Sequence, residues 1–274
     1  MPAASPVYDS ARRGLRFLEE ARDLWRYRYL VIELVRRDIT VRYKRSVLGI
    51  GWTMISPLLQ MLTMTWVFSV VIKQDIRNYP VYFLSGSIFW LFFSQATGHA
   101  ASLTFDAQEM SKRIFLPQSA FVLSAVGVAL VHLALSLVPL LVIVVWTGSA
   151  VHVSWLFLPV ALLISAAFTT GMGLLVFTLA SRFVDVKEMY IVLLQVWFFV
   201  TPIVYTPKLV PENYRFVIRY NPITYLIELF RAPLYDGWLP GANTLAFAVL
   251  ASFASLCLGW IFYAQKMETY GSRS

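Results

Sequence analysis

Basic side chains gather in one short segment near the start of the sequence, and their type points to phosphate chemistry. Five of them fall within ten residues: Arg36, Arg37, Arg42, Lys44 and Arg45. An arginine guanidinium matches two oxygens of one phosphate with parallel N–H donors, whereas lysine presents a point charge. Part of this charge also serves to anchor a membrane protein on its cytoplasmic side. The segment therefore predicts contact with anionic headgroups, substrate phosphates, or both.

Catalytic chemistry is not indicated anywhere in the sequence. The motif G-x-x-x-x-G-K-[ST] is absent, so no phosphate-binding loop for a nucleotide is expected in this chain. No H-E-x-x-H motif or cysteine pair suggests a metal site, and Cys257 is the single cysteine. His99, His132 and His152 lie in or between apolar segments and cannot be placed in a credible triad. We predict no catalytic residue, no metal ligand and no cofactor bound by this chain.

The basic segment runs directly into apolar sequence, and the composition is that of a polytopic membrane protein. Hydrophobic residues make up 58% of the chain and charged residues 14%, against about 25% charged in a typical soluble domain. The net charge of +8 lies mostly near the N-terminus, where anionic lipid attracts it, so nucleic acid is not an expected partner. Residues 1–23 are predicted to be a polar tail. Residues 24–51, with apolar positions at helical spacing, predict an amphipathic helix on the cytoplasmic membrane face, or one packed on a cytosolic partner.

Six apolar segments predict an all-α domain of six membrane spans over residues 52–264. They are Trp52–Ile72, Val81–Leu103, Ser119–Trp146, Ser154–Ser181, Met189–Tyr205 and Thr244–Ala264. The first has 21 residues and would reach about 31 Å as a helix, enough for one crossing. The fifth is short, with a bend expected at Pro202. The small-residue run 169–173 in the fourth favours close approach of a neighbouring helix.

The distribution of lysine and arginine predicts the orientation. With the N-terminus inside, the cytoplasmic segments carry 17 of these residues and the outer segments 6. The positive-inside rule then places both termini, including a tail at 265–274, in the cytoplasm. No signal peptide is evident, so the first span is expected to act as the targeting signal.

Three connections have unusual content. Residues 105–117 predict a short amphipathic cytoplasmic helix, and 182–188 form a second charged cytoplasmic loop; both are either solvated loops or docking points for a cytosolic subunit. Residues 206–243 are too many for a simple connection, because the median connection between helices or strands has about 4–6 residues. They predict two short helices, about 211–220 and 222–235, dipping into the outer leaflet without crossing; a seventh span is the alternative. Asn221 and Pro222 mark the start of the second helix and Gly237 its end. Glu228 and Arg231 are spaced to pair.

The predicted spans contain no Asp, Glu, Lys or Arg. Ion-coupled transporters place such a group at mid-membrane, so the energy for any transport is expected from another polypeptide. Aromatic residues are abundant in the spans, and most are expected to pack or to contact lipid. Some would instead line a channel, where sugar rings would slide over the faces of the aromatic side chains. The candidates are Trp66, Phe89, Trp90, Phe93, Trp197 and Phe198.

Four stretches in order resemble one known family. They are LVRRDITVRYKRSVLGIGWTMISPLLQML, EMSKRIFLPQS, FVDVKE and NPITYLIELFRAPLYDG. The chain is similar, from about Leu34 to Ala264, to permease subunits of bacterial ABC-2 type exporters of polysaccharides and polyol phosphates, which serve O-antigen, capsule and teichoic acid export. The resemblance implies a homodimer in the cytoplasmic membrane, paired with two copies of a separate ATPase that binds ATP and Mg.

The resemblance also implies roles for particular residues. The ATPase-coupling residues would be Glu109, Lys112, Arg113, Phe115 and Asp185. An interfacial gate that receives the lipid diphosphate would comprise Arg36, Arg37, Asp38, Arg42, Tyr43, Lys44 and Arg45. Helices within 207–237 would form an extracytoplasmic gate with Asn221, Pro222, Glu228 and Arg231.

The expected function is therefore that of the channel-forming subunit of an ATP-driven exporter of a lipid-linked polysaccharide or polyol phosphate polymer. Three other functions remain open. The first is ABC-2 export of drugs or small lipids. The second is a membrane-embedded glycosyl or acyl transferase, for which acidic and histidine groups are sparse. The third is a passive channel or scaffold without an ATPase.

Overall fold

The computed structural model describes residues 26–72, 76–113 and 117–271, and within these ranges the chain is helical, without a strand. The predicted tail at 1–23 lies outside them. The α-helices are α2 (Arg28–Tyr43), α3 (Trp52–Thr65), α4 (Tyr79–Ser102), α5 (Thr104–Arg113), α6 (Ser119–Trp146), α7 (Leu158–Ala180), α8 (Val186–Val200), α9 (Arg215–Arg219), α10 (Pro222–Arg231) and α11 (Ala242–Gly271). Short 3₁₀ and π segments are η1 (Gly49–Gly51), η2 (Trp66–Val71), η3 (Val153–Phe157), η4 (Pro207–Leu209), η5 (Glu212–Tyr214) and η6 (Ala232–Asp236). The predicted all-α class is confirmed.

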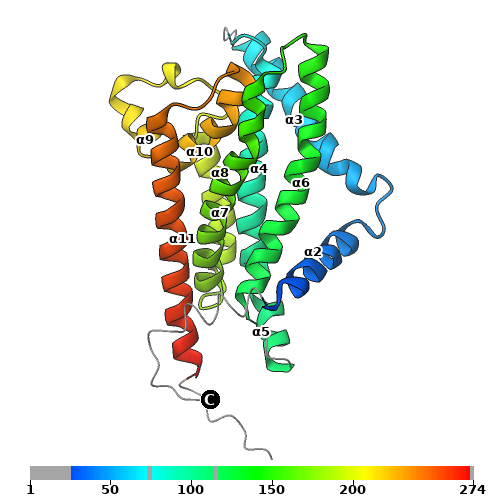
Figure 1. The fold of residues 1–274 in the computed structure, drawn as a ribbon, viewed down its shortest axis with the longest axis vertical. Coiled ribbons are helices and arrows are strands. Elements are labelled where there is room, and N and C mark those ends of the chain that lie inside the picture. The colour runs from blue at the N-terminus through cyan, green and yellow to red at the C-terminus, as the bar shows by residue number, and fades with distance from the viewer. Residues whose placement is uncertain (1–25, 73–75, 114–116, 272–274) are drawn as a thin grey trace, which may run out of the picture.

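The long helices form an elongated bundle with successive helices running in opposite directions (Figure 1). Helix α4 lies at the centre, in contact with α3, α6, α7, α8 and α10. Helix α2 lies against the side of α6, and α5 continues from α4 at one end of the bundle. Helices α9 and α10 lie at the opposite end. We call these the α5 end and the α10 end.

Within the described residues, four helical segments are long and apolar enough to cross a membrane: Gly49–Val71, Ser119–Trp146, Val153–Ala180 and Ala242–Gln265. They match four of the six predicted spans. The second predicted span corresponds to α4, which has 24 residues, is not one of these four segments and is enclosed by its neighbours. The fifth corresponds to α8, whose 15 residues reach only about 22 Å. Helix α8 ends at Val200, just before the predicted bend at Pro202.

The small residues of α7 allow its backbone to pack directly against the backbone of α11. A Cβ atom on Gly171 would lie 2.3 Å from the carbonyl of Ser255, and one on Gly259 would lie 2.2 Å from the carbonyl oxygen of Gly171. The Ser255 hydroxyl donates to the Phe168 carbonyl at 3.0 Å. The predicted close approach at this run is confirmed, with α11 as the partner. Only small residues permit such contact between helices in a membrane.

Aromatic rings hold α4 to its neighbours in the centre of the bundle. Phe89 stacks on Phe230 of α10 at 5.7 Å, and Phe93 contacts Phe168 of α7 at 5.8 Å between ring centroids. Both α4 rings are fully buried. Such contacts favour particular ring geometries and thereby define how α4 packs against α7 and α10.

Substitution Gly171→Ala is expected to destabilise the protein by about 1–3 kcal/mol, because the new methyl group has no space beside the Ser255 backbone. Thermal unfolding in detergent would show a lowered Tm. Gly51→Ala is the control, since a Cβ there meets nothing within 4 Å. Equal Tm values for the two variants would contradict the close contact.

Candidate functional site

A cleft of about 740 Å³ lies along one face of α4, bounded by α3 and α8. Trp90, Ser94, Gly98 and Ser102 line it at four-residue steps, which is one face of a helix. The volume falls within the range of about 300–1,000 Å³ typical of ligand sites. The cleft between α4, α3 and α8 is therefore a candidate ligand site.

The two ends of the cleft differ in chemistry. Towards the α10 end its walls are aromatic: Phe83, Trp90, Phe198 and Phe199. Towards the α5 end they are polar: Gln95, His99, Ser102 and, from α2, Arg42. One cation at the end of an aromatic-walled cleft suits a ligand with an anionic group and a body of flat rings.

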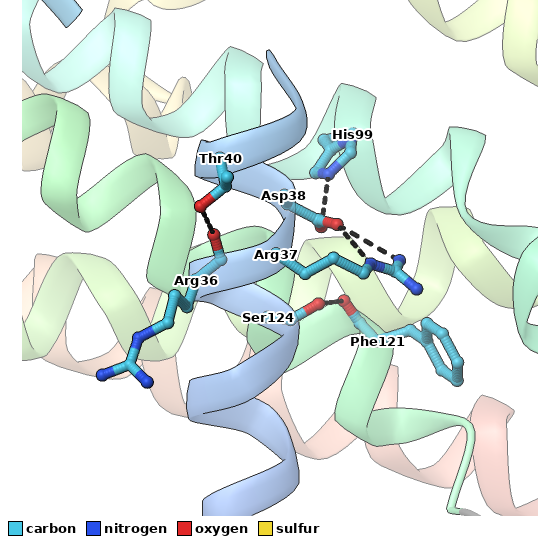
Figure 2. A network of polar contacts seen from close by, with 7 residues as sticks. All are labelled: Arg36, Arg37, Asp38, Thr40, His99, Phe121 and Ser124. Carbon is cyan, nitrogen blue, oxygen red and sulfur yellow. Dashed lines mark hydrogen bonds and ion pairs between the residues drawn. The ribbon is translucent and has the colours of Figure 1, made fainter. Parts of the chain in front are cut away.

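Helix α2 is held to the bundle by polar contacts beside this cleft. Asp38 Oδ2 lies 3.2 Å from His99 Nε2 on α4, and Asp38 Oδ1 accepts from Arg37 at 3.2 Å (Figure 2). A partly buried carboxylate is costly without partners, and these two groups provide them. The contact therefore ties α2 directly to the wall of the cleft.

A second polar contact lies five residues further along α2. Tyr43 Oη and His132 Nε2 of α6 are 3.2 Å apart, and His132 Nδ1 lies 2.9 Å from Gln95 Oε1 of α4. In this arrangement His132 accepts from the tyrosine hydroxyl and donates to the amide oxygen. We call the Asp38–His99 and Tyr43–His132–Gln95 contacts the α2 latch.

The predicted basic surface is divided by the structure. Arg36 pairs with Glu33 at 3.0 Å on the exposed face, and Figure 2 shows it pointing away from His99. Arg37 is engaged with Asp38. Lys44 and Arg45 are exposed after the end of α2. Arg42 is the residue of this group that lines the cleft.

The six candidate channel aromatics also fall into separate environments. Trp90 and Phe198 line the cleft. Phe89 and Phe93 are buried in the core, and Trp66 is 62% exposed on η2 and is not among the residues of the cleft wall. The indole of Trp197 donates to Asn221 Oδ1 at 3.0 Å, which gives it a structural partner.

The chain is unwound from Thr201 to Tyr205, and buried side chains satisfy the carbonyls freed there. Arg231 donates to the carbonyls of Pro202 at 2.9 Å and Ile203 at 3.2 Å. The hydroxyls of Tyr79 and Tyr82 donate to the carbonyls of Val204 and Tyr205, each at 2.9 Å. Non-helical backbone is tolerated at membrane depth only with such partners.

The prediction that Glu228 and Arg231 form an ion pair is therefore wrong. Arg231 is 5% exposed, and its guanidinium faces the unwound segment and lies 4.0 Å from the centroid of the Tyr82 ring. Freed carbonyls and an aromatic face stabilise the buried cation in place of a carboxylate. The spacing of three residues indicated a pair on one helix face, but a stronger set of acceptors lies across the bundle.

Asn221 caps α10 as the sequence predicts, and it also joins α10 to α8. Its side-chain oxygen accepts from the Ile223 amide at 3.1 Å, and its amide donates to the Thr201 hydroxyl at 2.9 Å. Pro222 is the first residue of α10. Gly237 ends η6 with φ of +84°, a conformation that favours glycine.

The predicted coupling residues lie at the α5 end. Glu109 is exposed on α5, and Lys112 and Arg113 are the last two positions of that helix. Asp185 is exposed immediately before α8. Phe115 lies outside the described residues. The described residues contain no group of three or more His, Cys, Asp or Glu side chains placed to hold a metal ion.

Residues 29–235 match the family model described as ABC-2 type transporter. The chain belongs to this family. It is 29% identical over 251 residues to the O-antigen export system permease protein RfbA of Myxococcus xanthus, covering 91% of this chain and 96% of the relative. It is 30% identical to the O-antigen export system permease protein RfbA of Klebsiella pneumoniae, covering 77% and 82%. It is 22% identical to the polysialic acid transport protein KpsM of Escherichia coli, covering 86% and 92%.

The ABC-2 match extends from α2 to η6, so it includes the cleft, the α2 latch and the unwound segment. With four helices apolar enough to cross a bilayer, this ABC-2 chain is a multi-pass membrane protein. Sequence reasoning missed the cleft glutamines Gln60, Gln95 and Gln195, because a count of charges passes over neutral amides. The spacing of Gln95 and His99 on one face of an apolar span would have been the signal.

Substitutions Asp38→Asn and Tyr43→Phe are expected to weaken the attachment of α2 to the bundle in this ABC-2 chain. Each weakens one contact of the α2 latch, and a buried partner left without its hydrogen bond costs about 1–3 kcal/mol. The measurement is the rate at which a charged maleimide labels a cysteine placed at Gly98, after Cys257→Ser. The labelling rate should rise several-fold, which is roughly the change in equilibrium that corresponds to a loss of 1 kcal/mol in the attachment of α2.

Glu33→Gln is the matched control, because it breaks only the exposed pair with Arg36. An exposed ion pair contributes about 0–1 kcal/mol, so labelling should not change. Equal labelling in all three variants would show that the latch does not hold α2.

Proposed function

We propose that this chain is the channel-forming permease subunit of an ATP-driven exporter that moves a lipid-linked polysaccharide or polyol phosphate polymer across the bacterial cytoplasmic membrane. The observation that carries the proposal is the cleft, with aromatic walls and Arg42 at its polar end. The relatives are named for O-antigen export and polysialic acid transport, which supports this substrate class.

The cleft suits such a substrate by its order of groups. A lipid diphosphate arriving at the α5 end would meet Arg42, whose paired donors match phosphate oxygens. The glycan would then follow the rings of Trp90 and Phe198 towards the α10 end. Aromatic faces contact sugar rings without strong directional bonds, which permits sliding.

Six crossings with both termini in the cytoplasm are the proposed topology, with α4 and α8 crossing as members of the bundle. The alternating direction of the helices supports this, because it brings α5 and the loop at 182–188 to the same end. That end would be the cytoplasmic one, where 17 of the 23 Lys and Arg residues would lie.

The energy is proposed to come from two copies of a separate ATPase that holds ATP and Mg. The absence of a nucleotide-binding motif from the sequence supports this division. Glu109, Lys112, Arg113, Phe115 and Asp185 would contact the ATPase and transmit its closure to α4 and α8, the helices next to them in the chain.

A second copy of the chain is proposed to close the open side of the cleft. Leu59 and Leu62 on α3 and Val196 and Phe199 on α8 are large, exposed and apolar. Only 11% of the first span's apolar window is buried within one copy. Two copies facing each other through α3 and α8 would join their clefts into one channel.

Arg42→Gln is expected to lower polymer export about tenfold, the equivalent of one hydrogen bond to a charged group. Arg36→Gln should have little effect, because Arg36 pairs with Glu33 outside the cleft. Export is measured as surface polysaccharide per assembled complex. Unchanged export in Arg42→Gln, with normal assembly, would remove Arg42 from the substrate path.

The proposed function is tested with the chain and its ATPase reconstituted together in lipid vesicles. Lipid-linked glycan should stimulate ATP hydrolysis and move across the membrane, whereas hydrophobic drugs should do neither. Stimulation by drugs alone would favour an exporter of drugs or small lipids. Glycan movement without the ATPase would identify a passive channel and refute the proposal.

A further inference from the structure

A second cleft, of about 770 Å³, lies at the α10 end of the bundle, apart from the cleft along α4. It is bounded by α9, α10 and the first turn of α11, and Figure 1 shows these elements at the end of the molecule opposite α5. The two clefts share no lining residue. The function proposed above does not use this second cleft.

Aromatic rings line the second cleft in two different ways. Phe216 and Tyr220 lie four residues apart, on one face of α9 and its end, and are 57% and 75% exposed. Tyr225 is fixed, because its ring stacks on Phe247 at 4.2 Å and its hydroxyl donates to the Arg219 carbonyl at 2.8 Å. The cleft thus has one rigid ring and two accessible ones.

Exposed rings at the end of a membrane bundle often form an interfacial belt, which needs no ligand. Two polar groups in this cleft are not explained by a belt. The Thr224 hydroxyl is buried with no hydrogen-bond partner among the described residues. The half-buried Glu228 carboxyl likewise has no hydrogen bond or ion pair in the described part of the chain, and burial raises its pKa. Buried polar groups without partners carry a cost that a ligand can remove.

The charges in the cleft select the class of ligand. Arg215 pairs with Glu212 at 3.2 Å, so the charged lining residues outside this ion pair are one cation, Arg219, and one carboxyl, Glu228. A phosphate or other anion bound in this cleft would share it with the Glu228 carboxyl. A neutral ligand rich in hydroxyl groups satisfies both, because a hydroxyl accepts from a guanidinium and donates to a carboxyl.

We propose that this second cleft is a glycan-binding site that holds neutral sugar residues of the polymer as it leaves the channel. Sugar ring faces would stack on Phe216 and Tyr220, and hydroxyl groups would bind Arg219, Glu228 and the Thr224 hydroxyl. That the ligand is the exported polymer, and that the α10 end faces outward, rests on the function proposed above. The affinity for neutral sugar rests on the cleft alone.

The test uses the full complex with its ATPase in exporting cells, with the photo-crosslinking residue p-benzoylphenylalanine in place of Tyr220. Light should attach polysaccharide to this chain, detected as a carbohydrate-positive shift in mass of the purified protein. The matched control carries the same residue at Tyr214, which is 63% exposed on η5 and does not line the cleft. Adding Arg219→Gln to the Tyr220 variant should lower attachment about tenfold.

Thr224→Val provides a second readout, because it keeps the shape of the side chain and removes the hydroxyl. The substitution should reduce attachment at position 220 while the Tm of the unliganded protein is unchanged or higher. A lowered Tm with unchanged attachment would mean that the hydroxyl has only a structural role and would count against the site.

Binding is also measured without export, on the purified complex in nanodiscs. The probe is the strain's own surface polysaccharide, released from its lipid by mild acid, with glycerol 1-phosphate as the anionic alternative. The polysaccharide should bind and glycerol 1-phosphate should not compete.

Normal export without attachment at position 220 would overturn this site and leave the proposed function standing. Attachment of phospholipid, or preference for glycerol 1-phosphate, would assign the cleft to a lipid headgroup. Failure of the unsubstituted complex to move lipid-linked glycan in reconstituted vesicles would instead refute the proposed function.

Discussion

The structure depends on satisfying the backbone carbonyls that are freed where α8 unwinds. Four consecutive carbonyls, from Pro202 to Tyr205, accept hydrogen bonds from Arg231, Tyr79 and Tyr82. These donors are buried, so the loss of one would leave a buried carbonyl without a partner, at a cost of about 1–3 kcal/mol. This requirement places α10 beside α4 and α8, at the α10 end of the bundle, towards which the walls of the cleft along α4 are aromatic. A cation in a membrane protein is usually taken as a functional group, but here Arg231 is first a structural one.

The same constraint orders the other polar groups of the bundle. Gln95, His99 and His132 lie within long helices, and α2 supplies partners to them through Asp38 and Tyr43. Helix α2 is thus part of the polar packing of the bundle. Its polar side chains complete hydrogen bonds that the bundle cannot complete alone. The cleft along α4 is polar where α2 reaches it and aromatic where it does not, and this gradient gives the cleft a direction.

Much of the fold could be predicted from the sequence, because the bilayer imposes length and apolar composition on each crossing helix. The helix ends at Asn221 and Gly237 and the close approach at Gly171 were also predictable, since each is a local steric or capping rule. Helix α4 shows the limit of this reasoning. The burial of most of its residues depends on five neighbouring helices, and the sequence of α4 does not specify which helices those are.

The sequence by itself determined the all-helical class, the basic segment before the first span, the lack of a nucleotide motif and the membership in a family of transporters. These properties reside in residue types and their spacing along one chain. Only the tertiary structure decided that Arg42 reaches the cleft while Arg36 does not, and that Trp90 and Phe198 line it while Phe89 and Phe93 are core. It also decided that Arg231 binds carbonyls in place of Glu228. The physical reason is the same in each case: periodicity gives the face of a helix on which a side chain lies, but the group opposite that face comes from a distant part of the chain.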